Sequence, residues 1–243
     1  MARGRTQDDE HRTALPHLRG YTHSELVWPL AAHARARTGI DREGPETVAN
    51  IEPLRRENLE EFEGLFRAIE GSDGSVVNSF LTLGRRPEIL RAFVDFARAV
   101  MGPGTVDSGL KQLVAQVAST SAGCRYCQSH TATSAAEQGI SEEKVRSLYD
   151  FEQSPFFDEA ERAALRLARD AALVPNATTP AHFEELRTYY TDEQSTELVA
   201  AIGLFGFLNR WNDTIATELE DEPFTFASHH LKDAGWEAGK HRA

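Results

Sequence analysis

Residues 110–138 read LKQLVAQVASTSAGCRYCQSHTATSAAEQ, and this stretch decides the fold. In its first half, apolar side chains recur at the three- and four-residue spacing of one helical face, as Leu110, Leu113, Val114 and Val117. Gly123 interrupts this pattern, and Gly139 follows the second half as a C-terminal stop signal. We therefore expect two consecutive helices, the second running from about Cys124 to Gln138.

Helical signals continue on both sides of this pair. Pro87 stands where the first turn of an apolar helix begins, a position that proline tolerates well. Asp158 with Glu161, and Thr191 with Gln194, have the spacing of capping boxes that start two further helices. We find no alternating pattern of the kind that β-strands show. The sequence predicts an all-α fold, a single domain of about eight to ten helices.

The longest expected helix runs from Asp192 to about Leu219. Between Leu198 and Phe207 it is apolar nearly all round, which is typical of a helix in a core or a subunit interface. Pro223 marks the expected end of the regular pattern. The chain is thus divided into four parts, which are a disordered tail (1–20), an N-terminal extension (21–50), the helical domain (51–222) and a loosely ordered C-terminal tail (223–243).

Composition and charge argue against several classes of protein. The 243 residues carry a formal net charge of −12, with 40% hydrophobic and 26% charged residues, the balance of a globular domain. This acidity disfavours binding to the phosphate backbone of nucleic acids. No apolar run approaches the roughly 20 residues that span a bilayer, and the first twenty residues lack the apolar core of a secretory signal. We expect a cytoplasmic protein without nucleic-acid or membrane partners.

The chain contains two cysteines, and they lie three residues apart. On a helix, Cys124, Cys127 and His130 would share one face, because each step is three residues. A thiolate in the first turn is stabilised by the helix N-terminus, which lowers its pKa. One thiol could then attack a peroxide and become a sulfenic acid, the other could condense with it to a disulfide, and the histidine could move protons.

Two other interpretations of the cysteine pair are open. The pair and His130 could be part of a zinc site, although a second ligand pair of the usual spacing is not present in the sequence. The two cysteines could also be small apolar core residues without chemistry. Their proximity, in a chain with two cysteines, favours chemistry.

The run Leu110 to Ser119, followed by Ala-Gly-Cys-Arg-Tyr-Cys-Gln-Ser-His-Thr at 122–131, resembles the carboxymuconolactone decarboxylase / alkylhydroperoxidase D-like (AhpD-like) family. The resemblance is strongest from about Asn78 to Gly139. It implies an AhpD-like helical fold, homo-oligomeric assembly, and peroxidase activity without metal or cofactor. It also implies catalytic roles, with Cys127 attacking the peroxide, Cys124 resolving the product and His130 relaying protons.

The sequence departs from the family's pattern at two positions. His130 follows Cys127 by three residues instead of four, a spacing that resembles peroxidase-related members. The family's proton-relay glutamate, twelve residues before the first cysteine, is replaced by Gln112. Glutamine at this catalytic position can orient a hydrogen bond but cannot accept a proton at neutral pH. The polar residues that could substitute are Glu137, Asn209, Asn212 and Asp213.

The leading prediction of function is therefore a thiol-dependent alkyl hydroperoxidase or disulfide oxidoreductase. Its partners would be a small hydroperoxide substrate and an external dithiol that reduces the disulfide. One alternative is a lyase of the carboxymuconolactone decarboxylase type, although such a lyase does not need the cysteine pair. The other is a non-enzymatic redox sensor, which Gln112 in place of glutamate would suit.

Overall fold

The computed structural model describes residues 48–70 and 74–242, and the expected tail and most of the extension before residue 48 lie outside them. The deciding stretch forms α4 (Ser108–Ala122) and α5 (Arg125–Glu137), as predicted. Asp107 caps α4 by accepting a hydrogen bond from the Leu110 N–H at 3.1 Å. Between the helices, Gly123 has φ +78°, a left-handed conformation that favours glycine.

The described residues form ten α-helices and no strand, which confirms the all-α prediction. Short 3₁₀ helices, labelled η, connect or extend them. The elements besides α4 and α5 are η3 (Arg56–Phe62), α1 (Glu63–Ile69), α2 (Asn78–Leu83), α3 (Pro87–Met101), α6 (Glu142–Arg146), η4 (Ser147–Asp150), α7 (Glu159–Ala171), α8 (Pro180–Leu186), α9 (Asp192–Ile215), α10 (Asp221–His230), η5 (Lys232–Ala234) and η6 (Gly239–His241). Within the described ranges, no helix has both the length and the apolar character that crossing a membrane requires.

The helix starts read from the sequence are confirmed. Pro87 occupies the first turn of α3. The side chain of Asp158 accepts from the Glu161 N–H at 2.8 Å, and the Glu161 carboxylate accepts from the Asp158 N–H. Thr191 and Gln194 make the same reciprocal pair at the start of α9. These caps satisfy N–H groups that the first turn leaves unpaired.

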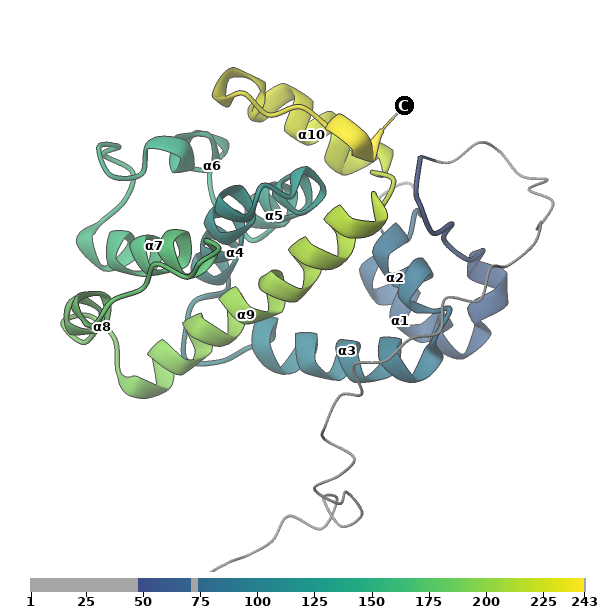
Figure 1. Cartoon of the computed structure of the whole chain (residues 1–243), viewed down its shortest axis with the longest axis horizontal. Coiled ribbons are helices and arrows are strands. Elements are labelled where there is room, and N and C mark those ends of the chain that lie inside the picture. The colour runs from purple at the N-terminus through teal and green to yellow at the C-terminus, as the bar shows by residue number, and fades with distance from the viewer. Residues whose placement is uncertain (1–47, 71–73, 243) are drawn as a thin grey trace, which may run out of the picture. The chain divides into compact units, whose positions relative to one another are not determined.

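Helix α4 lies at the centre and packs against α5, α7 and α9. Its buried side is mostly apolar, with Leu113, Val114, Ala115 and Ala118 completely inaccessible, although the polar Lys111, Gln116 and Ser119 are buried there as well. Helix α9 runs diagonally across this centre, and α3 contacts its middle (Figure 1). Burial of this apolar surface is the main stabilising contribution to the fold.

The apolar stretch of α9 is partly core and partly surface. Leu198, Ala201 and Leu204 are buried, whereas Val199 and Phe207 remain exposed, although the Phe207 ring lies 5.5 Å from the ring of Phe93 on α3. The inner side accounts for the core role expected of this stretch.

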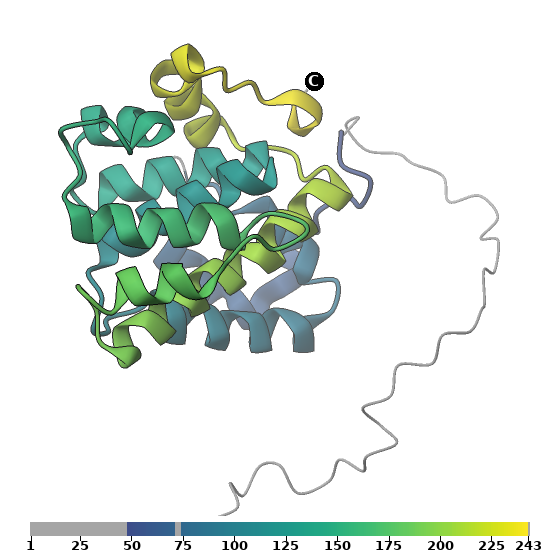
Figure 2. The ribbon, with the colours of Figure 1, turned by 60° about the vertical axis from the view of Figure 1, so that its left-hand side comes forward.

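The C-terminal part differs from the expectation. Helix α9 ends at Ile215 instead of Leu219, because Ala216 takes a left-handed conformation with φ +52°. The following residues form α10, where a loosely ordered tail was expected. Pro223 lies in the first turn of α10, where its missing N–H has no helical partner to lose. Figure 2 shows these yellow C-terminal elements lying over the teal helices of the centre, in agreement with the packing of α10 on α5.

Candidate active site

The two thiols lie at the N-terminus of α5. Cys124 is the N-cap residue, and its Sγ accepts a hydrogen bond from the Cys127 N–H at 3.4 Å. Both cysteines are free thiols, with exposed fractions of 0% and 3%. The structure therefore brings the two predicted redox residues together, one helical turn apart and covered by the rest of the domain.

Helix α9 supplies a polar contact to the second thiol. The Asn212 Nδ2 donates to Cys127 Sγ at 3.5 Å. Burial raises the pKa of the Cys127 thiol well above its usual range, the adjacent Cys124 thiol raises it further, and the Asn212 amide lowers it. The lowered pKa that we expected from the helix N-terminus is therefore wrong for Cys127, where loss of solvation by burial is the largest effect and raises the pKa.

His130 lies on the same helix as the thiols, but its hydrogen bond is to Glu220 and not to a cysteine. Its Nε2 lies 2.7 Å from Glu220 Oε2, in the linker that precedes α10. The imidazole also packs on the ring of Tyr126, with 4.5 Å between ring centroids. The hydrogen bond of the histidine is thus to a buried carboxylate, and its other ring nitrogen has no hydrogen-bond partner among the residues that the structure describes.

Glu220 collects three hydrogen bonds at the centre of this group. Besides His130, the Tyr126 hydroxyl donates to Oε1 at 2.8 Å and the Asn78 N–H donates to the same oxygen. Burial by itself would raise the pKa of Glu220, but His130 and the Asn78 N–H outweigh it and hold the pKa below its usual value. A deeply buried carboxylate is thereby kept ionised beside a histidine.

Glu220 was missed by reasoning from the sequence. It stands in the acidic run Glu218 to Glu222, three residues before Pro223. We interpreted that region as the end of the regular fold, so it offered no reason to single out one acid. The separation of 90 residues from His130 leaves no local spacing that could have revealed the pair.

Gln112 does not join the thiols. Its side chain is half-buried on α4 and, within the described part of the chain, makes no hydrogen bond. One turn later, Gln116 is buried and accepts from the Thr131 hydroxyl through its Oε1. This bond ties α4 to the turn of α5 that follows Cys127.

The four polar residues that we suggested in place of the missing glutamate have different surroundings. Asn212 contacts the thiol, whereas Asp213 pairs with Lys240 Nζ at 2.9 Å. Asn209 is buried, and neither polar atom of its side chain finds a partner among the described residues. Glu137 lies on α5, and burial followed by the nearby Glu222 raises its pKa.

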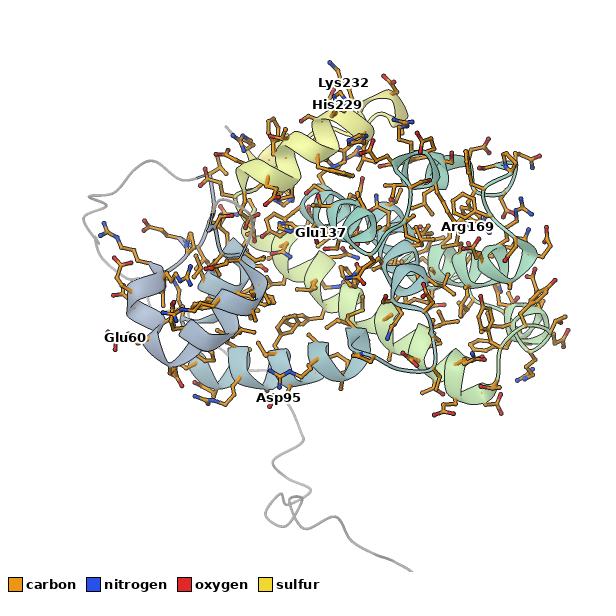
Figure 3. The ribbon with its side chains drawn as sticks, turned by 180° about the vertical axis from the view of Figure 1, so that it is seen from behind. Glu60, Asp95, Glu137, Arg169, His229 and Lys232 are labelled. Carbon is orange, nitrogen blue, oxygen red and sulfur yellow. The ribbon has the colours of Figure 1, made fainter. Side chains whose placement is uncertain are left out.

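A cavity of about 120 Å³ opens onto His130 between α5 and the start of α10. Figure 3 shows α10, with His229 labelled, above the end of α5 that carries Glu137. The residues lining the cavity are Ile69, Ser75, Val77, His130, Thr133, Ser134, Glu137, Glu220, Glu222 and Pro223. Three carboxylates border it, so its character is acidic.

Residues 48–70 and 74–242 do not contain the ligand geometry that a zinc site would require. No three histidine, cysteine or acidic side chains there gather closely enough to hold a metal ion. Nε2 of His130, a nitrogen that could bind a metal, is occupied by Glu220. The arrangement instead combines two thiols, an amide donor and a histidine–carboxylate pair, a set suited to thiol redox chemistry.

Fold and site together define a helical protein with a thiol pair at a helix N-terminus, and known proteins share its helical fold. An uncharacterized peroxidase-related protein from Ralstonia eutropha JMP134, described as an alkylhydroperoxidase AhpD core, superposes with a TM-score of 0.66 at 23% identity. The alignment covers 74% of this chain and 96% of that one. The fold is thus AhpD-like, as predicted.

The family model of the carboxymuconolactone decarboxylase family matches residues 87–170, a range that includes Cys124, Cys127 and His130. The chain belongs to this carboxymuconolactone decarboxylase / AhpD-like family. The ligand-free structure of the debrominase Bmp8 is 34% identical in sequence and superposes with a TM-score of 0.69. The alignment covers 73% of this chain and 96% of Bmp8. Its cysteine-to-alanine variant in complex with 2,3,4-tribromopyrrole is 33% identical, with the same TM-score. The uncharacterized protein YnjA of Escherichia coli is 29% identical over 145 residues, which are 58% of this chain and 79% of YnjA.

Proposed function

We propose that this protein is a thiol-dependent peroxidase in which Cys127 reduces a small hydroperoxide and Cys124 resolves the product. The observation that carries the proposal is the placement of two free thiols one helical turn apart, the second in contact with the Asn212 amide. Membership of a family that includes AhpD-like proteins supports it.

The reaction requires two steps at sulfur. The Cys127 sulfur attacks the outer oxygen of the hydroperoxide, so that the O–O bond breaks and a sulfenic acid and an alcohol form. The Cys124 sulfur then displaces water from the sulfenic acid and the S–S bond forms. An external dithiol reduces this disulfide by thiol exchange and returns both cysteines to thiols.

Protons must move in both steps. Burial keeps Cys127 protonated at rest, so its proton has to leave as the sulfur attacks. We assign the exchange of protons to His130, which lines the cavity and is held by ionised Glu220. The carboxylate accepts a hydrogen bond from the imidazole and orients the ring, and it supplies the negative charge that Gln112 lacks.

A second candidate reaction is the reductive removal of a halogen from an aromatic ring. Its support is the similarity to the debrominase Bmp8, at 33–34% identity over 96% of that protein. The same two thiols would supply the electrons, since one bromoarene and two thiols give one arene, one disulfide and one hydrogen bromide. Both candidates thus use a substrate that accepts two electrons from the thiol pair.

The remaining alternatives receive less support. A lyase of the carboxymuconolactone type would bind an anionic acid, but the cavity at His130 is bordered by Glu137, Glu220 and Glu222. Like charges repel, and burial strengthens the repulsion. A redox sensor would form the same disulfide without rapid turnover. A homo-oligomer and a cytoplasmic location, which the family resemblance and the sequence imply, remain part of the proposal.

The test is thiol titration after reaction with one equivalent of an oxidant, under anaerobic conditions. Cumene hydroperoxide and 2,3,4-tribromopyrrole are compared, with bromide release measured for the second. We expect two thiols to be lost with at least one of the two, none to be lost in Cys127→Ser, and a sulfenic acid trapped by dimedone in Cys124→Ser with the peroxide. Survival of both thiols with both oxidants would exclude thiol redox chemistry at this site, and loss with tribromopyrrole alone would favour dehalogenation.

A further inference from the structure

The residues from Trp236 to Arg242, here the C-terminal segment, are tied to the thiol site. Trp236 Nε1 donates to the Arg125 carbonyl at the first residue of α5, at 3.1 Å. Trp236 and His241 are 3% and 1% exposed, although they lie close to the end of the chain. These two buried side chains anchor the segment in the domain, while Glu237, Gly239 and Lys240 between them are exposed.

His241 holds the linker between α9 and α10. Its Nδ1 donates to the Thr217 carbonyl at 2.8 Å, and its own carbonyl accepts from the Leu219 N–H at 2.8 Å. Burial lowers the pKa of His241, which favours the neutral ring with its proton on Nδ1. The linker is thus fixed at two points by one residue.

Thr217 in turn fixes the amide that contacts the thiol. Its hydroxyl donates to Asn212 Oδ1 at 2.8 Å, and its N–H donates to the Asn212 carbonyl at 3.1 Å. Because Oδ1 is taken by the hydroxyl, the amide nitrogen is the atom that faces Cys127 Sγ. A donor at this position stabilises a thiolate, whereas an amide turned by 180° would present an oxygen and destabilise it.

The C-terminal segment also neutralises a charge near the thiol. Asp213 disfavours ionisation of Cys127 through its negative charge. Its carboxylate pairs with Lys240 Nζ at 2.9 Å and lies 3.6 Å from His241 Nε2. The two effects act in the same direction, since the segment both aims the amide donor and screens the carboxylate.

We propose that the C-terminal segment is a positioning element of the thiol site, which acts on Cys127 through the chain of contacts His241–Thr217–Asn212. The inference rests on the proposed function in one respect, the choice of Cys127 as the reacting sulfur. The groups that face this sulfur are Cys124 and Tyr126 from α5, and Asn212 and Asp213 from α9. The segment acts on the last two of these.

The experiment measures alkylation of Cys127 by iodoacetamide between pH 6 and 10 in a Cys124→Ser background. Serine is a good N-cap residue and leaves one thiol in the chain. Thr217→Val removes the hydroxyl without changing the shape of the side chain, and His241→Leu removes the ring donor. We expect each to slow alkylation at pH 7.5 by about three- to tenfold, the effect of one lost hydrogen bond, and to shift the midpoint of the pH profile upward.

The matched controls keep the donors. Thr217→Ser retains the hydroxyl, and His241→Asn places an N–H where Nδ1 was, so both should alkylate within about twofold of the parent. Lys240→Gln, at an exposed position, should also raise the midpoint, and it tests the charge effect if the buried variants do not fold. Unchanged or faster alkylation in Thr217→Val and Lys240→Gln would overturn the proposal. Alkylation by iodoacetamide does not need a peroxide. A protein without peroxidase activity would therefore still give a valid test of the positioning role.

Discussion

His130 Nε2 and Glu220 Oε2 lie 2.7 Å apart, although 90 residues separate them in the chain. The family's glutamate position on α4 is occupied by Gln112, whose side chain makes no hydrogen bond in the described ranges. The carboxylate that lies beside His130 is thus contributed from the linker before α10. Its ionisation is maintained by His130 and the Asn78 N–H in spite of burial.

Replacing the Glu220 carboxylate by an amide of the same size should slow the reaction of the thiols with peroxide without leaving a cavity. In Glu220→Gln the side chain keeps its size and can still accept from Tyr126, but it no longer places a negative charge beside His130. We expect the rate of thiol loss with cumene hydroperoxide to fall about a hundredfold. Stopped-flow thiol titration measures this rate, and thermal unfolding shows whether the fold is intact.

The control for this variant is Glu137→Gln. Glu137 lines the same cavity but is not bonded to His130, so the rate should change by about threefold or less. Equal losses of rate in the two variants would mean that the charge of the cavity matters and that the His130–Glu220 bond does not.

A buried ion pair should contribute strongly to stability. Lys111 is completely inaccessible, and its Nζ lies 2.6 Å from Glu197 Oε1 and 2.6 Å from the Gly102 carbonyl. Lys111→Ala leaves Glu197 without its cation, and we expect the free energy of unfolding to fall by about 3–5 kcal/mol. Urea unfolding measures the loss. Arg98→Ala, which breaks an exposed pair with Asp95, should cost about 0.5 kcal/mol or less.

The same pair predicts how stability depends on pH. Burial opposes ionisation of Glu197, but Lys111 and Thr105 lower its pKa to about 2. Since the unfolded chain binds this proton at a higher pH than the folded chain, the contribution of Glu197 is fully present above about pH 4.5 and is lost as the pH falls toward 2. The stability gap between wild type and Glu197→Gln should therefore shrink from pH 6 to pH 3 in urea unfolding, and a constant gap would contradict the assignment.

Two glycine-to-alanine substitutions should have opposite effects. At Gly123 a new Cβ would meet no atom within 4 Å, but the φ of +78° is strained for alanine, so we expect a loss of about 1–2 kcal/mol. At Gly203, inside α9, the space is equally open and the conformation is helical, so Gly203→Ala should stabilise by about 0.5–1 kcal/mol. Thermal or urea unfolding of both variants compares the two effects directly, and a loss at both sites would point to steric crowding instead of backbone strain.

The features that sequence predicted correctly are local ones. The capping pairs Asp158–Glu161 and Thr191–Gln194 involve atoms three residues apart, so their side chains indicate a helix start in any surroundings. The C-terminal tail was predicted wrongly because Pro223 has two local meanings, a helix end or a first turn. The packing of the following residues on α5 decides between them.

The sequence by itself determined the all-helical fold, the family and the pairing of the two cysteines at a helix start, because short-range periodicity and spacing carry that information. The tertiary structure decided the environment of these residues. Asn212 reaches Cys127 across 85 residues, and Glu220 reaches His130 across 90. Burial then reversed the pKa shift expected for Cys127, since solvation depends on all the elements that surround the sulfur and not on the turn that carries it.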